Sequence, residues 1–401
     1  MLRQDQLANI VDSQKEDLLK DISSITRESL DQIPDLESFA TLVTGIRRCG
    51  KSTLLQQLIR QKYHDAFFLN FEDIRLAGFD VSDFSRLYDE IVKRKIPVLL
   101  FDEPQITDKW EIFVNQLLRE KYKVFITGSN ATLLSKELGT HLTGRNLSFE
   151  LFPFSYNEFL IFKGLERNPE SLDKYLTEGG MPEFLRSGMG MVLNRLIDDI
   201  LTRDIAMRHS VRNIQILRQL IVYLFSNVGN LISANNMAGM FGIKSVTTFL
   251  EYFSYLSDAY LVAFIPQFNW SVKAQARNPK KIYAIDTGFI TEAATLFTEN
   301  LGARFENLVF LHLRRKYDSI YYFREKQECD FVAFHRNQPA EVVQACYQVD
   351  EMNFDREFLG IAKALKYFNM GSGTIVTFNQ KDTFNKEGLT IRMVPAWEYL
   401  V

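Results

Sequence analysis

Cysteine, signal-peptide features and long apolar runs are all scarce or missing in this chain of 401 residues. Its three cysteines are widely spaced and lack metal-ligand spacing, which excludes a disulfide framework and a zinc site. The N-terminus lacks the basic-then-apolar layout of a secretion signal. No uncharged apolar run approaches the ~20 residues that a membrane span needs. These absences predict a reduced, cytoplasmic protein without a membrane partner.

A strong net charge is also missing. The formal charge of −3 at pH 7 gives no global electrostatic attraction to nucleic acid, so any such contact would depend on local basic patches. The length predicts two or three domains, and a hydrophobic content of 46% is ample for their cores.

The chain does contain a phosphate-binding pattern, Gly-Ile-Arg-Arg-Cys-Gly-Lys-Ser-Thr, at 45–53. A β-prone run at 39–44 precedes it, and leucines and isoleucine at helical spacing follow it at 54–59. Strand, glycine loop and helix N-terminus together direct backbone N–H groups and the helix dipole at one anion. The predicted nucleotide-binding residues are Gly45, Arg48, Cys49, Gly50, Lys51, Ser52 and Thr53.

Individual roles follow from the residue types in this loop. Gly45 and Gly50 permit backbone angles and close approaches that a Cβ would block. Lys51 can reach the β- and γ-phosphates of ATP, and the Ser52 hydroxyl can ligate Mg²⁺. ATP and Mg²⁺ are therefore the predicted ligand and metal.

A second motif is an apolar strand at 98–101 that ends in Asp102 and Glu103. Strands and helices alternate from 39 to about 155, which predicts a parallel sheet whose ligands bind at the carboxyl ends of its strands. There Asp102 would hold Mg²⁺ together with Ser52, and Glu103 would act as the general base for the attacking water.

Two further polar residues are candidate catalytic groups. Asn130 follows the strand at 123–127, where it or Ser129 would contact the γ-phosphate or cap the next helix. Arg145 precedes another strand, where it is either a surface charge or a cation that stabilises the γ-phosphate, from its own chain or a neighbouring subunit.

Several motifs together resemble a family of prokaryotic AAA-type ATPases. Besides the loop at 45–53 they are Leu-Leu-Phe-Asp-Glu-Pro-Gln at 99–105, Thr-Gly-Ser-Asn at 127–130, Thr-Gly-Arg at 143–145, Phe-Pro-Phe-Ser at 152–155, Glu-Gly-Gly-Met-Pro-Glu at 178–183 and Lys-Lys-Ile-Tyr-Ala-Ile-Asp at 280–286. In that family a winged helix and a C-terminal domain of unknown function with a restriction-endonuclease-like core follow the ATPase. The resemblance implies ATP binding and hydrolysis, strengthens Arg145 as an arginine finger, and favours a homo-oligomer.

The predicted fold is α/β, a P-loop NTPase parallel sheet with helices on both faces, followed by a helical and winged-helix region and a C-terminal α/β domain. The expected parts are an N-terminal helical segment (1–36), the AAA-type core (37–155), a helical lid or linker (156–212), the winged helix (213–300) and the restriction-endonuclease-like domain (301–401). Gly179 and Gly180 either orient the lid helices over the nucleotide or form an ordinary turn.

The predicted winged helix has a basic loop with Lys273, Arg277, Lys280 and Lys281, which favours DNA. Its third helix argues the other way, because the face expected to point outward carries one acid and no arginine. That face consists of Thr247, Thr248, Glu251, Tyr252 and Tyr255. A protein partner is therefore the alternative.

The C-terminal order of elements matches a nuclease core, which needs a helix Glu, a strand Asp and a Glu-x-Lys to hold Mg²⁺ and activate water. Glu306 and Asp330 fit the first two positions. The third position fails, because Gln344 and Cys346 stand there, and a shift to Glu341 still lacks the lysine. The domain is thus predicted to be inactive as a nuclease.

The leading hypothesis is an ATP hydrolase that acts as a conformational switch or motor on a protein or nucleic-acid partner. The alternatives are an ATP-gated DNA-binding module and a Mg²⁺-dependent nuclease.

Overall fold

The computed structural model describes residues 2–20, 24–129, 144–243, 245–294 and 300–401. The chain divides into two compact units, Met1–Phe152 and Pro153–Val401. None of the described helices is both long and apolar enough to cross a membrane.

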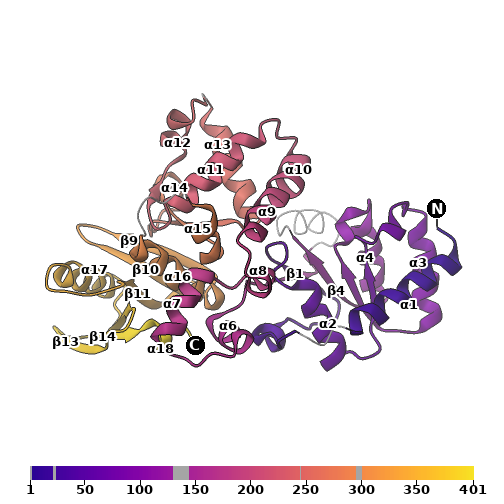
Figure 1. Cartoon of the computed structure of the whole chain (residues 1–401), viewed down its shortest axis with the longest axis horizontal. Coiled ribbons are helices and arrows are strands. Elements are labelled where there is room, and N and C mark those ends of the chain that lie inside the picture. The colour runs from indigo at the N-terminus through magenta and orange to yellow at the C-terminus, as the bar shows by residue number, and fades with distance from the viewer. Residues whose placement is uncertain (1, 21–23, 130–143, 244, 295–299) are drawn as a thin grey trace. The chain divides into compact units, whose positions relative to one another are not determined.

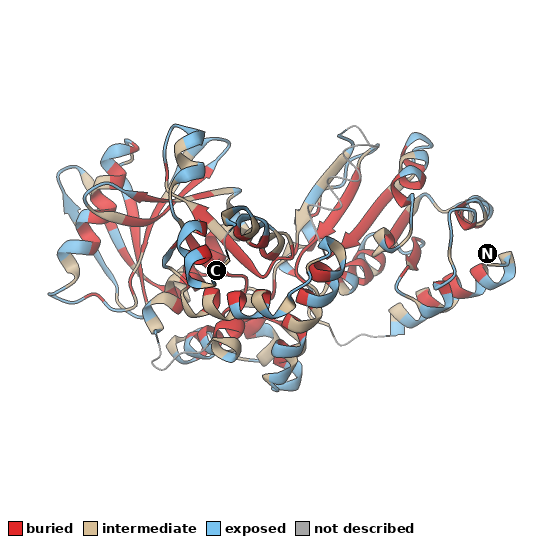
Figure 2. Ribbon diagram, turned by 90° about the horizontal axis from the view of Figure 1, so that it is seen from above, coloured by how far each residue is buried: buried red, intermediate tan, exposed pale blue. Residues whose placement is uncertain are grey.

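The first unit is built on a five-stranded sheet in the order β2-β3-β4-β1-β5, in which all neighbouring pairs are parallel (Figure 1). Its strands are β1 (Ala40–Thr44), β2 (Phe67–Asn70), β3 (Val98–Asp102), β4 (Lys123–Gly128) and β5 (Asn146–Glu150), and its larger connecting helices are α2 (Lys51–Gln61), α3 (Asp83–Arg94) and α4 (Trp110–Arg119). The central strands are buried, as Figure 2 shows. The predicted parallel sheet is confirmed.

Helix α1 (Gln4–Lys20) belongs to the core of the first unit. Leu7, Ile10 and Val11 are buried in the same apolar cluster as strands β2 and β3. The Gln14 amide pairs with the backbone of Asn70, accepting its N–H at 2.7 Å and donating to its carbonyl at 3.0 Å. Because β2 is an edge strand, these bonds satisfy backbone groups that would otherwise be open to pairing.

The second unit begins with a helical region. Its helices are α6 (Tyr156–Lys163), α7 (Pro169–Glu178), α8 (Pro182–Ser187), α9 (Met191–Asp199), a π-helix (Ile200–Ala206), α10 (Met207–His209), α11 (Ile214–Ser226), α12 (Ala234–Met240), α13 (Val246–Asp258), α14 (Val272–Arg277) and α15 (Thr287–Ala293). Strands β6 (Leu231–Ile232), β7 (Val262–Pro266) and β8 (Lys280–Ala284) form an antiparallel sheet in the order β6-β8-β7.

The face of α13 differs from its prediction. Tyr252, which was expected to point outward, is buried, whereas Leu250 of the same helix is 56% exposed. Tyr255 stacks on His209 of α10, with ring centroids 3.8 Å apart. The helical period could not reveal that Tyr255 has a stacking partner on α10.

The Gly179–Gly180 turn is a close-packing site for Asp286. The Asp286 carboxylate accepts the Gly180 N–H at 2.6 Å and caps α15 through the Gly288 N–H at 2.9 Å. A Cβ on Gly180 would lie 2.3 Å from the Phe154 carbonyl oxygen. These contacts explain both glycines by packing within the second unit and favour the ordinary turn.

A mixed sheet in the order β13-β14-β12-β11-β10-β9 completes the second unit. Its strands are β9 (Ser319–Arg324), β10 (Glu328–His335), β11 (Gln338–Ala345), β12 (Ser372–Thr377), β13 (Asp382–Lys386) and β14 (Leu389–Pro395), accompanied by helices α16 (Leu301–Lys316), α17 (Phe354–Tyr367) and α18 (Ala396–Tyr399). The pairs β11–β12 and β12–β14 are parallel and the others antiparallel.

Candidate nucleotide-binding site

The phosphate-binding loop connects the carboxyl end of β1 to the first turn of α2. Gly45 has φ +146° and Gly50 has φ +103°, angles that residues with a Cβ rarely adopt. A Cβ on Gly45 would also lie only 2.2 Å from the Leu151 carbonyl oxygen. Arg48 is exposed, with φ +65°. The backbone of the loop therefore packs closely against Leu151 at Gly45 and adopts positive φ angles at Gly45, Arg48 and Gly50.

Lys51 lies folded back into this loop with only 6% of its surface exposed. Its Nζ donates to the carbonyl oxygens of Gly45 at 3.0 Å and Ile46 at 3.1 Å. No carboxylate among the described residues forms an ion pair with it. Since neutral carbonyls do not cancel its charge, the ammonium retains its attraction for a phosphate.

The end of β3 meets the start of α2 at a single hydrogen bond. Ser52 Oγ donates to Asp102 Oδ2 at 2.7 Å, and Thr127 Oγ1 on the adjacent strand donates to the other carboxylate oxygen. Burial raises the pKa of Asp102, and the two hydroxyl donors oppose that shift. Because their oxygens are in contact, Ser52 and Asp102 can ligate one hard cation together.

Glu103 is a strained residue beside this pair. Its φ of +54° and ψ of +42° are unusual for a residue other than glycine, and such strain is concentrated at functional sites. Burial raises the pKa of Glu103 to about 7, against the opposing charge of Lys51. The Gln105 amide donates to its Oε2. A carboxyl group with a pKa near neutrality is suited to general-base chemistry.

Ser129, at the end of β4, is 2% exposed, and its Oγ has no hydrogen-bond partner among the described residues. The same holds for Gln105 Oε1. Buried polar atoms without partners are rare in proteins, and a bound ligand or water would satisfy them. Asn130, the other predicted residue here, lies outside the described residues.

Arg145 is not brought to the site of its own chain. It is exposed, and its carbonyl accepts the Ala40 N–H at 3.0 Å at the start of β1. The phosphate-binding loop follows the other end of that strand, at Thr44, so about 13 Å of extended chain separates the two. In its own chain Arg145 therefore lies at the amino ends of β1 and β5, whereas the phosphate-binding loop follows the carboxyl end of β1. Its role at a nucleotide stays a prediction.

Arg27 is a contact that the sequence reasoning missed. It is 4% exposed, and its Nη1 donates to the Cys49 carbonyl at 2.9 Å while Nη2 donates to Phe152 at 2.6 Å. It thereby supports the loop from behind. No local signal marks it, because its partners lie 22 and 125 positions away.

Cys49 and Glu72 also have roles that the motif did not specify. The Cys49 side chain is fully buried, and burial raises the pKa of its thiol, which donates to the Leu151 carbonyl at 3.4 Å. Cys49 can thus contribute only its backbone to a nucleotide. Glu72 Oε1 forms an ion pair with Arg47 Nη1 of the loop at 3.5 Å. Its position just after the end of β2 could have marked it as a residue near the site.

The predicted nuclease residues form a separate group in the second unit. Glu306 and Asp330 are close together, and the Gln344 Oε1 accepts the Asp330 N–H at 3.1 Å. Glu341 lies elsewhere, accepting the hydroxyl groups of Tyr317 at 3.1 Å and Tyr399 at 2.7 Å. The lysine missing from the sequence motif is replaced in space by Lys281 of β8.

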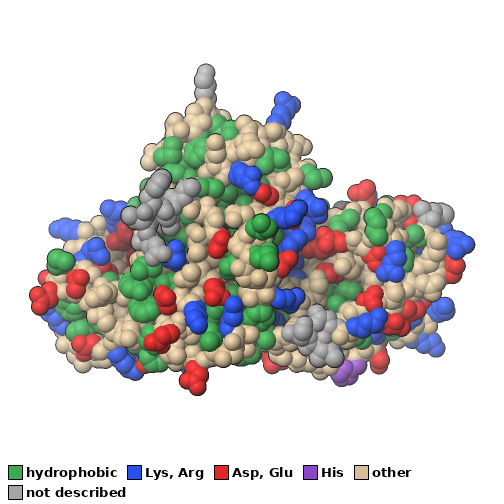
Figure 3. Space-filling model, in the orientation of Figure 1, with side chains coloured by type: hydrophobic (Ala, Val, Ile, Leu, Met, Phe, Trp, Pro, Cys, Tyr) green, Lys and Arg blue, Asp and Glu red, His purple; other side chains and the backbone are tan. Residues whose placement is uncertain are grey.

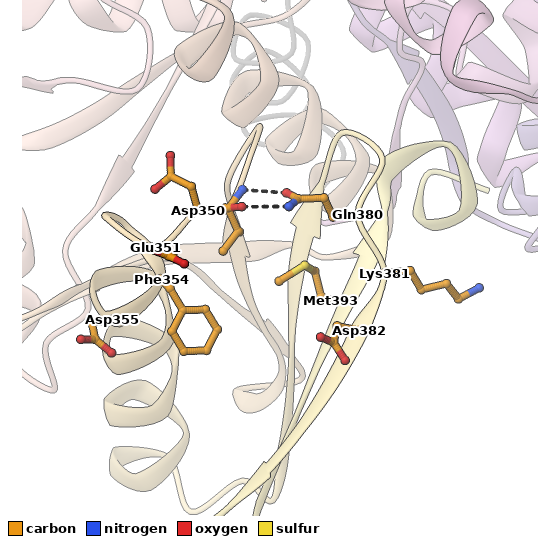
Figure 4. Close-up of a pocket in the computed structure, with 9 residues that line it drawn as sticks. Asp350, Glu351, Phe354, Asp355, Gln380, Lys381, Asp382 and Met393 are labelled. Carbon is orange, nitrogen blue, oxygen red and sulfur yellow. Dashed lines mark hydrogen bonds between the residues drawn. The ribbon is translucent and has the colours of Figure 1, made fainter.

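An open hollow of about 690 Å³ in the C-terminal sheet region has the wrong charge for a nucleotide. Four carboxylates and one lysine line it, above Phe354 and Met393 (Figure 4). Gln380 closes one side by pairing with the backbone N–H and carbonyl of Val349, at 2.7 and 2.8 Å.

Comparison with known proteins agrees with the geometry of the first unit. Residues 37–160 match the family described as AAA domain, and residues 169–300 match a domain of unknown function, which ends before the C-terminal region that was expected to carry one. The AAA domain implies nucleotide binding, typically with Mg²⁺. A solved structure of the yeast (S. cerevisiae) Hsp104–casein complex covers 62% of this chain and 60% of that chain at 12% identity, with a TM-score of 0.29 that is too low to indicate a shared architecture.

Two relatives match almost end to end. "Uncharacterized protein MJ1544" of Methanocaldococcus jannaschii is 34% identical over 390 residues, 89% of this chain and 87% of that protein. An uncharacterized protein of Haemophilus influenzae is 30% identical over 355 residues, 83% and 88% respectively. The chain therefore belongs to the family of these two proteins, in which an AAA-type P-loop domain is followed by a domain of unknown function.

Proposed function

We propose that this protein is an ATP hydrolase that converts ATP and water to ADP and phosphate. The observation that carries the proposal is the hydrogen bond from Ser52 to Asp102, which joins the phosphate-binding loop to the strand end that bears Glu103. This bond brings together, at the carboxyl ends of β1 and β3, a phosphate-binding loop, two candidate ligands for a cation and a candidate general base. Structural packing alone requires none of these in combination.

Each residue has a distinct task in this proposal. Gly45, Gly50 and the backbone around Arg48, Cys49 and Thr53 surround the phosphates, and Lys51 leaves its two carbonyl partners to neutralise them. Glu103 accepts a proton from the attacking water. Ser129, and Asn130 beyond it, supply polar contacts near the γ-phosphate, where the orphaned Ser129 hydroxyl fits such a ligand.

Mg²⁺ fits the oxygen atoms that this site offers. Ser52 and Asp102 would hold it, since their oxygens already lie 2.7 Å apart and both are ligand types that it prefers. Bound there, the ion would neutralise charge on the phosphate oxygens.

Two substitutions test the proposal. Lys51→Ala should abolish measurable ATP binding, because the buried cation of the cradle is lost. Glu103→Gln should bind ATP but lower turnover by at least about 100-fold, within the range for loss of a catalytic proton acceptor. Binding is read from fluorescent-nucleotide titration and turnover from phosphate release.

Matched controls come from the same elements. Lys62→Ala, just beyond α2, and Asp108→Asn, an exposed acid before α4, should leave both readouts near wild type. Wild-type turnover in both Lys51→Ala and Glu103→Gln would rule out this assignment.

The second unit is proposed to receive the resulting conformational change, so that the protein works as a switch or motor. Helices α11, α12 and α13 with strands β6, β7 and β8 have the order of a winged helix, and the sheet β9–β14 has that of a restriction-endonuclease-like domain. Arg145 is proposed to act on the nucleotide of a neighbouring copy in a homo-oligomer, since its exposed position at the far sheet edge makes it accessible to another subunit.

A DNA or protein partner at the β7–β8 connection is a second candidate function. Trp270 and Val272 are 77% and 78% exposed there, next to Lys273 and Arg277. The face shown in Figure 3 has acidic and basic side chains interspersed, which favours a local contact over a broad nucleic-acid surface. A gel-shift assay at increasing salt with the ATP-bound Glu103→Gln protein would distinguish a DNA partner from a protein partner. Binding to DNA should weaken steeply with salt, because it depends on contacts with phosphates.

A further inference from the structure

Strand β8 carries a lysine that is almost completely buried. Lys281 has a side-chain exposure of 3%, and its Nζ lies 3.0 Å from Glu306 Oε1, 2.8 Å from Glu328 Oε1 and 2.8 Å from Asp330 Oδ1. An ammonium group has three hydrogens, so each can be donated to one carboxylate. We call Lys281, Glu306, Glu328 and Asp330 the ammonium cluster.

Further hydrogen bonds hold Glu306 and Asp330 in the ammonium cluster. Tyr283 donates its hydroxyl to Glu306 Oε1 at 2.6 Å, and the Ala345 N–H donates to Asp330 Oδ2 at 3.1 Å. Gln344 accepts the Asp330 N–H and donates to Glu357 at 2.6 Å. Gln344, one of the two residues at the predicted third nuclease position, therefore supports the cluster by a hydrogen bond to Asp330.

The three neighbouring carboxylates stabilise the charged form of the buried lysine. Burial disfavours the charged lysine, but the neighbouring acids, Asp330 foremost, outweigh it and raise the pKa of Lys281 well above its usual value. A buried group of carboxylates needs a cation, and Lys281 supplies one.

Among the described residues, no group of three or more His, Cys, Asp or Glu side chains can hold a metal ion as the chain stands. We propose that the ammonium of Lys281 occupies the point where Glu306, Glu328 and Asp330 would otherwise hold a divalent cation, and that it locks β8 to α16 and β10. Three carboxylate oxygens converge on one point at 2.8 to 3.0 Å. A Ca²⁺ ion takes such oxygens at about 2.3–2.6 Å, so they would have to move inward by well under 1 Å.

This arrangement differs from a hydrolytic metal site. In such a site the ion needs an open position for water, and the lysine must remain free to act on the nucleophile. Here the ammonium donates to Glu306 and Asp330 and forms a further ion pair with Glu328, all in the same chain. The ammonium cluster is a structural lock, and metal can enter only if the lysine is removed.

The test is to remove the ammonium and offer Ca²⁺ to the full-length, nucleotide-free protein. Lys281→Ala should lower Tm in EDTA, and Ca²⁺ at about 100 times its Kd should then raise Tm by about 5 °C or more. Wild type should show no such shift. Calorimetric titration should give at least about tenfold tighter Ca²⁺ binding in the variant than in wild type, which corresponds to about 1.4 kcal/mol.

Three controls make the result specific. Lys280→Ala changes the neighbouring, half-buried lysine of β8 and should behave as wild type. Asp102→Asn in each background removes the nucleotide-site cation ligand and should not alter the Ca²⁺ response. Lys281→Ala combined with Asp330→Asn should lose that response, because a ligand is gone. If Lys281→Ala does not fold without metal, Lys281→Gln keeps a donor and takes its place.

Three outcomes would overturn the proposal. They are Ca²⁺ stabilising wild type as strongly as Lys281→Ala, Ca²⁺ failing to stabilise or restore either lysine variant, and Mg²⁺-dependent DNA cleavage by wild type that disappears in Asp330→Asn.

Discussion

The two units each contain a nearly buried lysine beside an aspartate, yet the two lysines are held in opposite ways. Lys51 bonds to two backbone carbonyls, whereas Lys281 forms ion pairs with three carboxylates. A cation held by neutral dipoles can exchange them for a phosphate. One surrounded by carboxylates is already neutralised. The partners, more than the burial, separate a binding group from a structural one.

The two aspartates repeat this contrast. Asp102 is held by the hydroxyl groups of Ser52 and Thr127, which can rotate when an ion arrives. Asp330 is held by the Ala345 backbone N–H, which cannot turn away without moving a strand, and by the buried ammonium of Lys281. The first site is adaptable and the second is rigid.

The largest expected effect comes from the same substitution at both lysines. Lys281→Met should lower the free energy of unfolding by about 3–5 kcal/mol, because it leaves buried carboxylates without their cation. Lys51→Met should cost only about 1 kcal/mol, since two carbonyl bonds are lost. Urea unfolding without nucleotide or metal measures both. Equal losses would break the comparison, and Lys280→Met should stay within about 0.5 kcal/mol of wild type.

Acid should destabilise the second unit through His312. Burial, followed by the charges of Lys316 and Arg315, lowers the pKa of His312 from 6.5 to about 3. Between these values the unfolded chain binds a proton that the folded one does not, so the free energy of unfolding falls as pH falls, by about 2 kcal/mol at pH 5. His312→Leu should flatten the difference between urea midpoints at pH 7 and pH 5.

The exposed His64 of the first unit provides the matched control for that experiment. His64→Leu should keep the wild-type dependence on pH. An unchanged slope in His312→Leu would mean that other groups cause the acid sensitivity.

The smallest expected effect sharpens the contrast between the aspartates. Thr127→Val removes one hydroxyl donor from Asp102, which should cost about 1 kcal/mol and lower ATP turnover about five- to tenfold. Thr127→Ser keeps the hydroxyl and should restore turnover. Rescue by Ser would show that the donor, and not the volume of the side chain, positions Asp102; failure of rescue would contradict that role.

Much of the first unit was predictable because its signals are local. Buried parallel strands appear as continuous apolar runs, as at 98–101, and the glycines and Lys51 occupy adjacent positions. Arg145 shows the limit of such reasoning. Its spacing in the sequence could not reveal that β5 begins beside the amino end of β1, whereas the phosphate-binding loop follows the carboxyl end of β1.

The second unit was less predictable because its contacts join distant elements. The helical middle and the C-terminal sheet were expected, but Tyr255 was assigned to solvent because its stacking partner on α10, His209, could not be placed from the sequence. The Gly179–Gly180 turn could not be explained until Asp286, more than a hundred positions away, was seen to accept its N–H.

The sequence by itself determined the phosphate-binding loop, because a backbone cradle is made by consecutive residues and needs little from the rest of the chain. Only the tertiary structure decided what the C-terminal carboxylates do. Lys281 is 25 positions from Glu306 and 49 from Asp330, on three different elements. An ion pair depends on distances of a few ångströms, which sequence separation cannot specify, and so packing alone converted a motif without its lysine into a closed structural lock.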